Sequence, residues 1–299
     1  NLMRYERPQK GRLRSFYQYN VDILGEPGVG ADAELIGCLV DSLCAFGLDS
    51  NDFKVRLSDR DLWVLFLKYW GVQDTAIPSV LSTMDRIEKM DAASALEQLK
   101  DHLKEDAQPF IQSVKALFKV QCLSELEAFF SSLSANGEQA DGFKNRIEDL
   151  SRLFATLQSM NLGQYVFVDF KIVRGLAYYT GFVFEAFEAT GKGRALAGGG
   201  RYDDLIGKLS GNPMEAGGFA IGDVTLLDLL NDKAKIPDYV PSADIAFIFS
   251  GEAESDCMLK DAHGFRREGF KVEYTTKEMT FSKQFKDAGQ KGIRFAFIY

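Results

Sequence analysis

One stretch of the chain places a single cation and a pair of tyrosines beside an apolar hairpin: Val173-Arg-Gly-Leu-Ala-Tyr-Tyr-Thr-Gly-Phe-Val-Phe-Glu-Ala-Phe187. The residues from Val168 to Val173 and from Phe182 to Phe187 alternate like two half-buried strands. A guanidinium at Arg174 costs free energy between them unless an anion or a carboxylate meets it. Arg174 is therefore either the partner of a structural carboxylate such as Glu185, or a residue that binds an anionic ligand.

The beginning of the chain joins a basic loop to an alternating strand. Its cations lie within residues 4–14 and are Arg4, Arg7, Lys10, Arg12 and Arg14. Pro8 and Gly11 mark the loop, and Gln18, Asn20 and Asp22 share one face of the strand that follows. Because arginine presents a fork of donors that matches phosphate oxygens, this arrangement favours a polyanionic ligand. A solvated basic loop is the alternative, and the polar face of the strand argues against it.

A third segment, Ala195-Leu-Ala-Gly-Gly-Gly-Arg-Tyr-Asp-Asp-Leu205, ends a short apolar strand in three glycines. Glycines at this place allow the backbone to approach a ligand or a second strand closely. The segment matches neither the dinucleotide-binding fingerprint nor the phosphate loop that ends in Gly-Lys-Ser/Thr. Arg201 and Tyr202, which follow the glycines, carry more information than the glycines themselves.

These segments together resemble the histidyl-tRNA synthetases, a family of class II aminoacyl-tRNA synthetases. Arg4-Tyr-Glu6 and its loop resemble class II motif 2, while Arg174-Gly-Leu-Ala-Tyr-Tyr179 and Gly199-Gly-Arg-Tyr-Asp203 resemble the two histidine-specific signatures. The resemblance covers nearly the whole chain. It implies an α+β fold, in which a class II antiparallel sheet flanked by helices carries a helical insertion and a C-terminal α/β domain similar to an anticodon-binding domain.

The resemblance also implies roles for single residues. In ATP binding, Arg4 would hold the α-phosphate, Glu6 would lie near the adenine amino group, Arg12 would reach the outer phosphates, and Phe16 would stack on adenine. The residues implied for histidine binding are Gln18, Asp22, Arg174, Tyr178, Tyr179 and Tyr202. Arg4 and Arg174 would flank the α-phosphate and are the implied catalytic residues.

The implied reaction needs fixed cations rather than a nucleophilic side chain. The histidine carboxylate attacks the α-phosphorus of ATP, and cations with Mg²⁺ stabilise the charge that spreads over the phosphoryl oxygens. The histidyl group then passes to the terminal ribose of tRNA(His). The implied partners are histidine, ATP with Mg²⁺, tRNA(His) and a second copy of the chain, in the cytoplasm or an organelle. No metal site of the protein's own is expected, because the cysteines lack CxxC spacing and the only histidines are His102 and His263.

Three positions depart from the family pattern. Asp22 stands where many members have glutamate, and Ala177 replaces an aspartate of the signature. In the stretch Gly218-Phe-Ala-Ile-Gly-Asp-Val-Thr-Leu226, Thr225 stands where the third class II motif has an arginine. A subgroup associated with plant organelles and some bacteria resembles this chain in these variants. A non-catalytic histidine sensor, like the synthetase-like regulatory subunit of ATP phosphoribosyltransferase, is the alternative function.

The periodicity and the resemblance together divide the chain. We expect a catalytic core in residues 1–58, a helical insertion in 59–137, the rest of the core in 138–234, a linker in 235–242 and a truncated α/β domain in 243–299. Leu35, Leu39 and Leu43 predict a helix over 31–46, and 143–160 reads as another. Strands and helices alternate after the linker, which predicts a parallel or mixed sheet.

The composition is that of an ordinary globular protein, with 46% hydrophobic and 26% charged residues. No apolar stretch reaches the roughly 18–20 residues that a membrane span needs. The net charge of −8 does not favour nucleic-acid binding by the chain as a whole, so contacts with tRNA would require local patches. The chain opens almost on motif 2 and ends on an apolar strand, so we expect an incomplete protein that lacks the family's motif 1.

Overall fold

The computed structural model describes residues 1–5, 13–85, 99, 107–173, 178–190, 195–237, 240–277 and 279–299. They form two compact units, Asn1–Ile236 and Pro237–Tyr299. Each unit has a hydrophobic core of its own. The boundary falls inside the segment that the two prolines of 235–242 mark as a linker, because proline cannot continue a helix.

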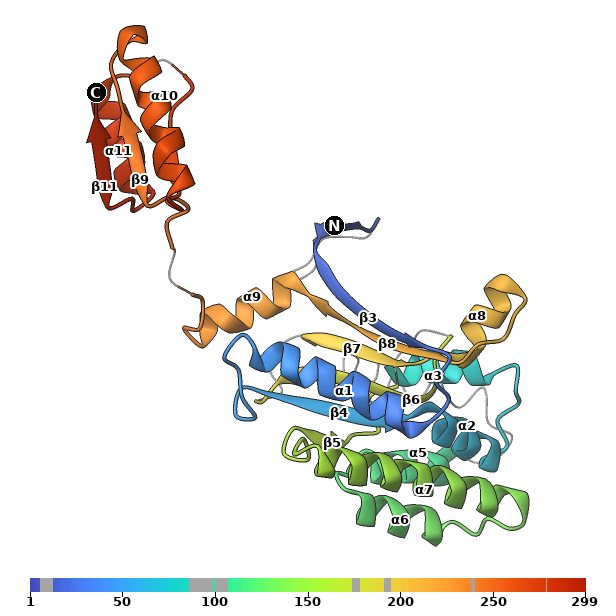
Figure 1. Ribbon diagram of the computed structural model, residues 1–299. Helices are drawn as coiled ribbons and strands as arrows, with labels where there is room; N and C mark the ends of the chain where they lie inside the picture. Colours follow the sequence, from blue (N-terminus) through green and yellow to red (C-terminus); the bar gives the residue numbers. More distant parts are fainter. Residues whose placement is uncertain are drawn as a thin grey trace. The chain divides into compact units, whose positions relative to one another are not determined.

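The first unit is built on a six-stranded sheet (Figure 1). In spatial order its strands are β3 (Gln18–Leu24), β8 (Ala216–Gly222), β7 (Ala197–Arg201), β6 (Thr180–Glu188), β4 (Phe53–Asp59) and β5 (Val166–Val168). All neighbours are antiparallel except β4 and β5. The expected antiparallel sheet is therefore confirmed.

The predicted hairpin around Arg174 is wrong. β5 and β6 do not pair with each other, because β4 lies between them and pairs with both. The chain leaves the sheet after Val168, where the Asp169 carboxylate accepts a hydrogen bond from the Lys171 amide at 3.0 Å and closes a turn. β6 is also buried on both faces over much of its length rather than half-buried.

A separate short ladder holds the expected motif 2 hairpin. β1 (Leu2–Met3) pairs antiparallel with β2 (Ser15–Phe16), so that Leu2 opposes Phe16. The Arg4 amide donates to the Arg14 carbonyl at 2.9 Å and continues the pairing by one step. The loop that the hairpin carries, with Glu6 and Arg12, lies outside the described residues.

Two long helices cover one face of the sheet. α1 (Val29–Cys44) contacts β3, β7 and β8, and α7 (Glu138–Ser159) lies beside α1 (Figure 1). The leucines at 35, 39 and 43 are all buried, which confirms the predicted amphipathic helix. The buried stripe of α7 repeats every three or four residues from Phe143 to Leu157, as expected for a helix that packs on one side.

Shorter helices extend the same core. They are α2 (Arg60–Tyr69), α3 (Ile77–Asp85), α5 (Ala107–Leu117) and α6 (Leu123–Ser132). Trp63 and Phe66 of α2 contact rings from α5, α6 and the turn after β5, so these helices share one core with the sheet. The assignment of 59–137 as a separate insertion stays a prediction.

The glycine-rich strands each lead into a helix. α8 (Asp203–Ser210) follows β7 after one residue, and α9 (Asp223–Asp232) follows β8 directly.

The second unit alternates strands and helices as predicted. Its elements are β9 (Ile245–Ile248), α10 (Glu252–Arg267), β10 (Val272–Tyr274), α11 (Phe281–Gln290) and β11 (Phe295–Ile298). The strands run parallel in the order β10-β9-β11. The sheet is thus fully parallel in the part of the chain that the structure describes. No helix of that part is both long and apolar enough to cross a bilayer.

The glycine at 199 should be essential for the spacing of β7 and β8. A Cβ there would collide with the Gly218 carbonyl oxygen and lie 2.6 Å from Phe219 Cβ. We expect Gly199→Ala to lower the free energy of unfolding by about 2 kcal/mol or more, because the backbone cannot move aside. Urea denaturation measures this loss. Gly30→Ala, with open space around its Cβ position, is the control and should cost nothing; equal effects would contradict the packing argument.

Candidate functional site

The site lies on the face of the sheet that α1 does not cover. The two faces can be told apart at neighbouring glycines of β8: a Cβ at Gly217 would lie 3.1 Å from Leu35 of α1, whereas a Cβ at Gly218 would collide with the Asp22 carboxylate. Asp22 opposes Gly218, and Gly218 opposes Gly200 on the next strand. The open face therefore has a floor of bare backbone next to Asp22.

Three tyrosines stand around this floor. Tyr178 and Tyr179 have ring centroids 4.8 Å apart, and Tyr178 meets Tyr202 edge-on at 6.1 Å. A Cβ at Gly200 would lie 3.0 Å from the Tyr179 ring, so glycine makes room for that ring. The rings pack with Ile172 and Val183 in a cluster of their own, away from the main core.

One hydrogen bond joins two residues that are 180 positions apart. The Tyr202 hydroxyl donates to Asp22 Oδ1. Burial raises the pKa of Tyr202, and the bond to Asp22 raises it further, so the phenol stays protonated at neutral pH. The structure thus brings together Asp22, Tyr178, Tyr179 and Tyr202, as the sequence predicted.

The structure describes only some of the other residues that the sequence predicted for the site. Gln18 opposes Gly222 at the start of β3, and strand alternation puts it on the same face as Asp22. The Arg4 guanidinium lies over the Phe16 ring at 4.1 Å, so a cation already covers one face of the ring predicted to stack on adenine. Arg174 and Ala177 lie outside the described residues, as do Glu6 and Arg12.

The third-motif stretch is tied to the motif 2 strands through Asp223. Its carboxylate accepts from the Tyr17 amide at 3.0 Å, and its own amide donates to the Tyr17 carbonyl at 3.2 Å. Thr225 is half-buried in the first turn of α9. Among the described residues, no group of three or more histidine, cysteine, aspartate or glutamate side chains could hold a metal ion.

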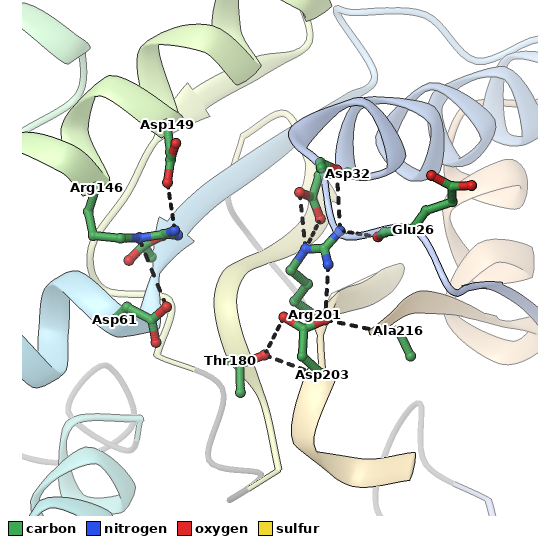
Figure 2. A network of polar contacts seen from close by, with 11 residues as sticks. Glu26, Asp32, Asp61, Arg146, Asp149, Thr180, Arg201, Asp203 and Ala216 are labelled. Atoms are coloured by element: carbon green, nitrogen blue, oxygen red, sulfur yellow. Dashed lines mark hydrogen bonds and ion pairs between the residues drawn. The ribbon is translucent and has the colours of Figure 1, made fainter. Parts of the chain in front are cut away.

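Arg201 is a structural residue, and the sequence did not reveal this. Its Nε donates to the Asp32 carboxylate at 3.0 and 3.2 Å, and its Nη1 donates to Asp203 at 2.9 Å (Figure 2). Its Nη2 donates to the backbone carbonyls of Glu26 and Gly28. With only 6% of its surface exposed, Arg201 joins the end of β7 to the starts of α1 and α8 rather than binding a ligand.

A second arginine with carboxylate partners, the half-buried Arg146, escaped sequence reasoning altogether. Arg146 of α7 forms ion pairs with Asp59 and Asp149. An arginine within a charged amphipathic helix carries no local signal of this kind, because its buried partner Asp59 lies 87 positions away in the chain. The one available hint was Asp59, a carboxylate that ends a buried strand and directly precedes a helix.

Comparison with known proteins identifies the kind of fold and family. The family model described as "Histidyl-tRNA synthetase" matches residues 1–225. A histidine–tRNA ligase of Opitutus terrae is 43% identical over 99% of this chain and 66% of its own length. The chain thus spans just under two thirds of that relative.

Solved structures show the same fold. The crystal structure of a histidyl-tRNA synthetase from Nostoc sp. PCC 7120 has a TM-score of 0.75 at 24% identity and covers 95% of this chain and 66% of the other. An ATP phosphoribosyltransferase regulatory subunit/histidyl-tRNA synthetase from Bacillus halodurans has a TM-score of 0.72 at 21% identity, with 97% and 70% covered. At these identities the two likenesses bear on the fold alone.

The Asp32–Arg201 pair predicts a specific pH dependence. Burial raises the pKa of Asp32 from 3.8 to about 6, against the attraction of Arg201. Between about pH 4 and 6 the folded protein then holds a proton that the unfolded chain has released. The free energy of unfolding should therefore fall as pH rises through this window, by up to about 3 kcal/mol from this group.

The measurement is urea denaturation of wild type and Asp32→Asn at pH values from 4 to 7. The variant cannot titrate at this position, so the wild type should lose stability relative to it as pH rises. A wild type that gains stability relative to Asp32→Asn over the same range would mean that the arginine, not burial, dominates this carboxyl.

Proposed function

The chain belongs to the histidyl-tRNA synthetase family, and from that premise we propose that it activates histidine with ATP and transfers the histidyl group to tRNA(His). The observation that carries the proposal is the Asp22–Tyr202 hydrogen bond beside Tyr178 and Tyr179, above a floor without side chains. An imidazole ring has one N–H donor and one acceptor nitrogen. Asp22 supplies an acceptor for the N–H, and the Tyr202 hydroxyl, which donates its one hydrogen to Asp22 Oδ1, holds that carboxylate in place.

The chemistry that we propose requires few side chains. An oxygen of the histidine carboxylate attacks the α-phosphorus, a P–O bond forms, and the bond to the pyrophosphate breaks. In the second step a ribose hydroxyl of the tRNA attacks the histidyl carbonyl, and AMP leaves. Arg4, next to Phe16 on the motif 2 hairpin, and Arg174, from the signature, are the cations proposed to stabilise the phosphoryl charge. Mg²⁺ would accompany the ATP phosphates.

Several other features belong to the same proposal. It extends to tRNA(His) as substrate, a homodimeric state and a location in the cytoplasm or an organelle, all suggested by family membership, and the parallel sheet of the second unit supports an anticodon-binding role for it. Thr225 and Ala177 favour the alternative, a histidine sensor without ATP chemistry. The 43% identity to a histidine–tRNA ligase over nearly the whole chain supports the enzyme over the sensor.

The test is histidine-dependent exchange between ATP and pyrophosphate by the full-length protein, with the other amino acids as controls. Exchange with histidine alone would support the ligase. Arg174→Ala should reduce the rate by at least about a hundredfold, the scale for loss of one preorganised donor to a transition state. Histidine binding without exchange would instead favour the sensor, and an Arg174→Ala variant with normal turnover would remove Arg174 from the catalytic residues.

Tyr202 should matter for histidine and not for ATP. Tyr202→Phe removes the hydroxyl that bonds Asp22, so we expect the KM for histidine to rise about tenfold, the effect of one lost hydrogen bond to a charged group. The KM for ATP should stay within about twofold. Tyr19→Phe is the control, because Tyr19 lies on the same strand as Asp22 but on the opposite face of the sheet. An unchanged KM for histidine would place Tyr202 outside the pocket.

A further inference from the structure

Asp59 is a carboxylate with no access to solvent, and it depends on one arginine. It ends β4, and its Oδ1 accepts the Leu62 amide at 2.6 Å, which caps α2. Its Oδ2 accepts from the Arg146 guanidinium. Burial raises the pKa of Asp59, and the charge of Arg146 opposes that rise. The pair therefore joins three elements, namely β4, α2 and α7.

Arg146 also contacts the beginning of β6. Its guanidinium carbon lies 4.9 Å from the centre of the Phe182 ring, and Asp59 opposes Phe182 in the β4–β6 ladder. Gly181 has a φ of 53°, and a Cβ there would lie 3.4 Å from Arg146 Nη2 and 3.6 Å from Arg201 Cδ. Gly181 thus lies close to both the half-buried Arg146 and the buried Arg201.

The strand pairing is interrupted at this same point. On its β7 side, β6 pairs Thr180 with Arg201 and then Val183 with Gly200, so Gly181 and Phe182 have no β7 partner in the ladder. Side-chain contacts flank this point on both sides, although the ladder is interrupted only on the β7 side. Figure 2 shows them: Arg146 with its carboxylates in one cluster, and Arg201 with Asp203 and Thr180 in the other.

On the side of β6 that faces β7, Thr180 holds the strand through Asp203. Its hydroxyl accepts from the Asp203 amide at 3.1 Å and lies 3.4 Å from an Asp203 carboxylate oxygen, and Asp203 is itself bound to Arg201. The residues just before Thr180 are Tyr178 and Tyr179, which stand over the glycine floor. The position of the bulge at Gly181–Phe182 therefore helps to define where these two tyrosine rings lie.

From these contacts we propose that Arg146 is a positioning residue for the histidine pocket. It touches no substrate, and it acts by holding the Gly181–Phe182 bulge against Asp59, so that Tyr178 and Tyr179 keep their place beside Tyr202. The inference rests on the proposed function and deepens it. Arginine suits the task because its planar fork reaches Asp59 and Asp149 while its face lies on Phe182.

The experiment compares variants of the full-length protein. Arg146→Met alone would leave Asp59 buried without its cation, a change costly enough to compromise folding, so the main variant combines it with Asp59→Asn, which keeps an oxygen to cap α2. Arg146→Lys retains the charge but not the fork. Arg152→Met is the matched control, since Arg152 lies on the same helix and binds the same Asp149, yet contacts neither Asp59 nor Phe182 in the structure.

The readouts are the KM for histidine, the KM for ATP and kcat in pyrophosphate exchange, together with histidine affinity by calorimetry. We expect the double variant to raise the histidine KM and Kd about tenfold or more, since small misplacements of binding groups have effects of this size. The KM for ATP should stay within about twofold, and Arg146→Lys should lie between wild type and the double variant. Arg152→Met should match wild type.

A purely structural role would give a different result. It would reduce the folded fraction, and hence the apparent kcat, while the histidine KM and Kd stayed at the wild-type values; this outcome would overturn the inference and leave the proposed function intact. A wild type that binds histidine without exchange would contradict the ligase, and the calorimetric comparison would still decide the role of Arg146. A wild type that does not bind histidine would overturn both.

Discussion

The Arg201 guanidinium is almost completely shielded from solvent, so the protein itself must supply its hydrogen-bond acceptors. The positions of these acceptors define the arrangement of the elements around the open face. Asp32 lies in the first turn of α1, Asp203 begins α8, and the two carbonyls belong to the turn between β3 and α1. A buried arginine without such partners would cost several kcal/mol. The end of β7, the start of α1 and the start of α8 can therefore satisfy it only together. Asp203 also connects Arg201 to two further strands. Its amide donates to the Thr180 hydroxyl of β6, and its carboxylate accepts from the Ala216 amide at the start of β8.

The second constraint is the absence of side chains in the middle of the sheet. Gly199 and Gly217 have their missing side chains toward the core, and Gly200 and Gly218 toward the open face. The first pair lets β7 and β8 pack under Phe184 and α1 without a collision. The second pair leaves room beside Asp22 and Tyr179. One glycine-rich sequence thus serves close packing on one side of the sheet and an empty floor on the other, because neighbouring strand residues face opposite ways.

Arg146 and Arg201 illustrate how ion pairs with buried carboxylates, Asp59 and Asp32, define a geometry that apolar packing leaves loose. Hydrophobic contacts tolerate small shifts, whereas a guanidinium must meet its carboxylates at defined distances and angles. The β6 bulge near the two arginines lacks ladder bonds to β7, so its position depends on these side-chain contacts. It is also the part that leads directly to the pair of tyrosines.

Much of this protein could be predicted from local sequence. The leucines of α1, the alternation of β3 and the apolar patterns of the second unit each specify an element through the period of their own side chains. The signature motifs also indicated correctly that Asp22 and Tyr202 belong together. The sequence by itself therefore determined many of the elements and indicated which side chains gather on the open face of the sheet. Only the tertiary structure decided that β4 separates β5 from β6, that Arg201 is buried structure rather than a ligand-binding residue, and that Arg146 reaches Asp59. The reason is that strand order and buried ion pairs depend on residues far apart in the chain, and no local period records which of them meet.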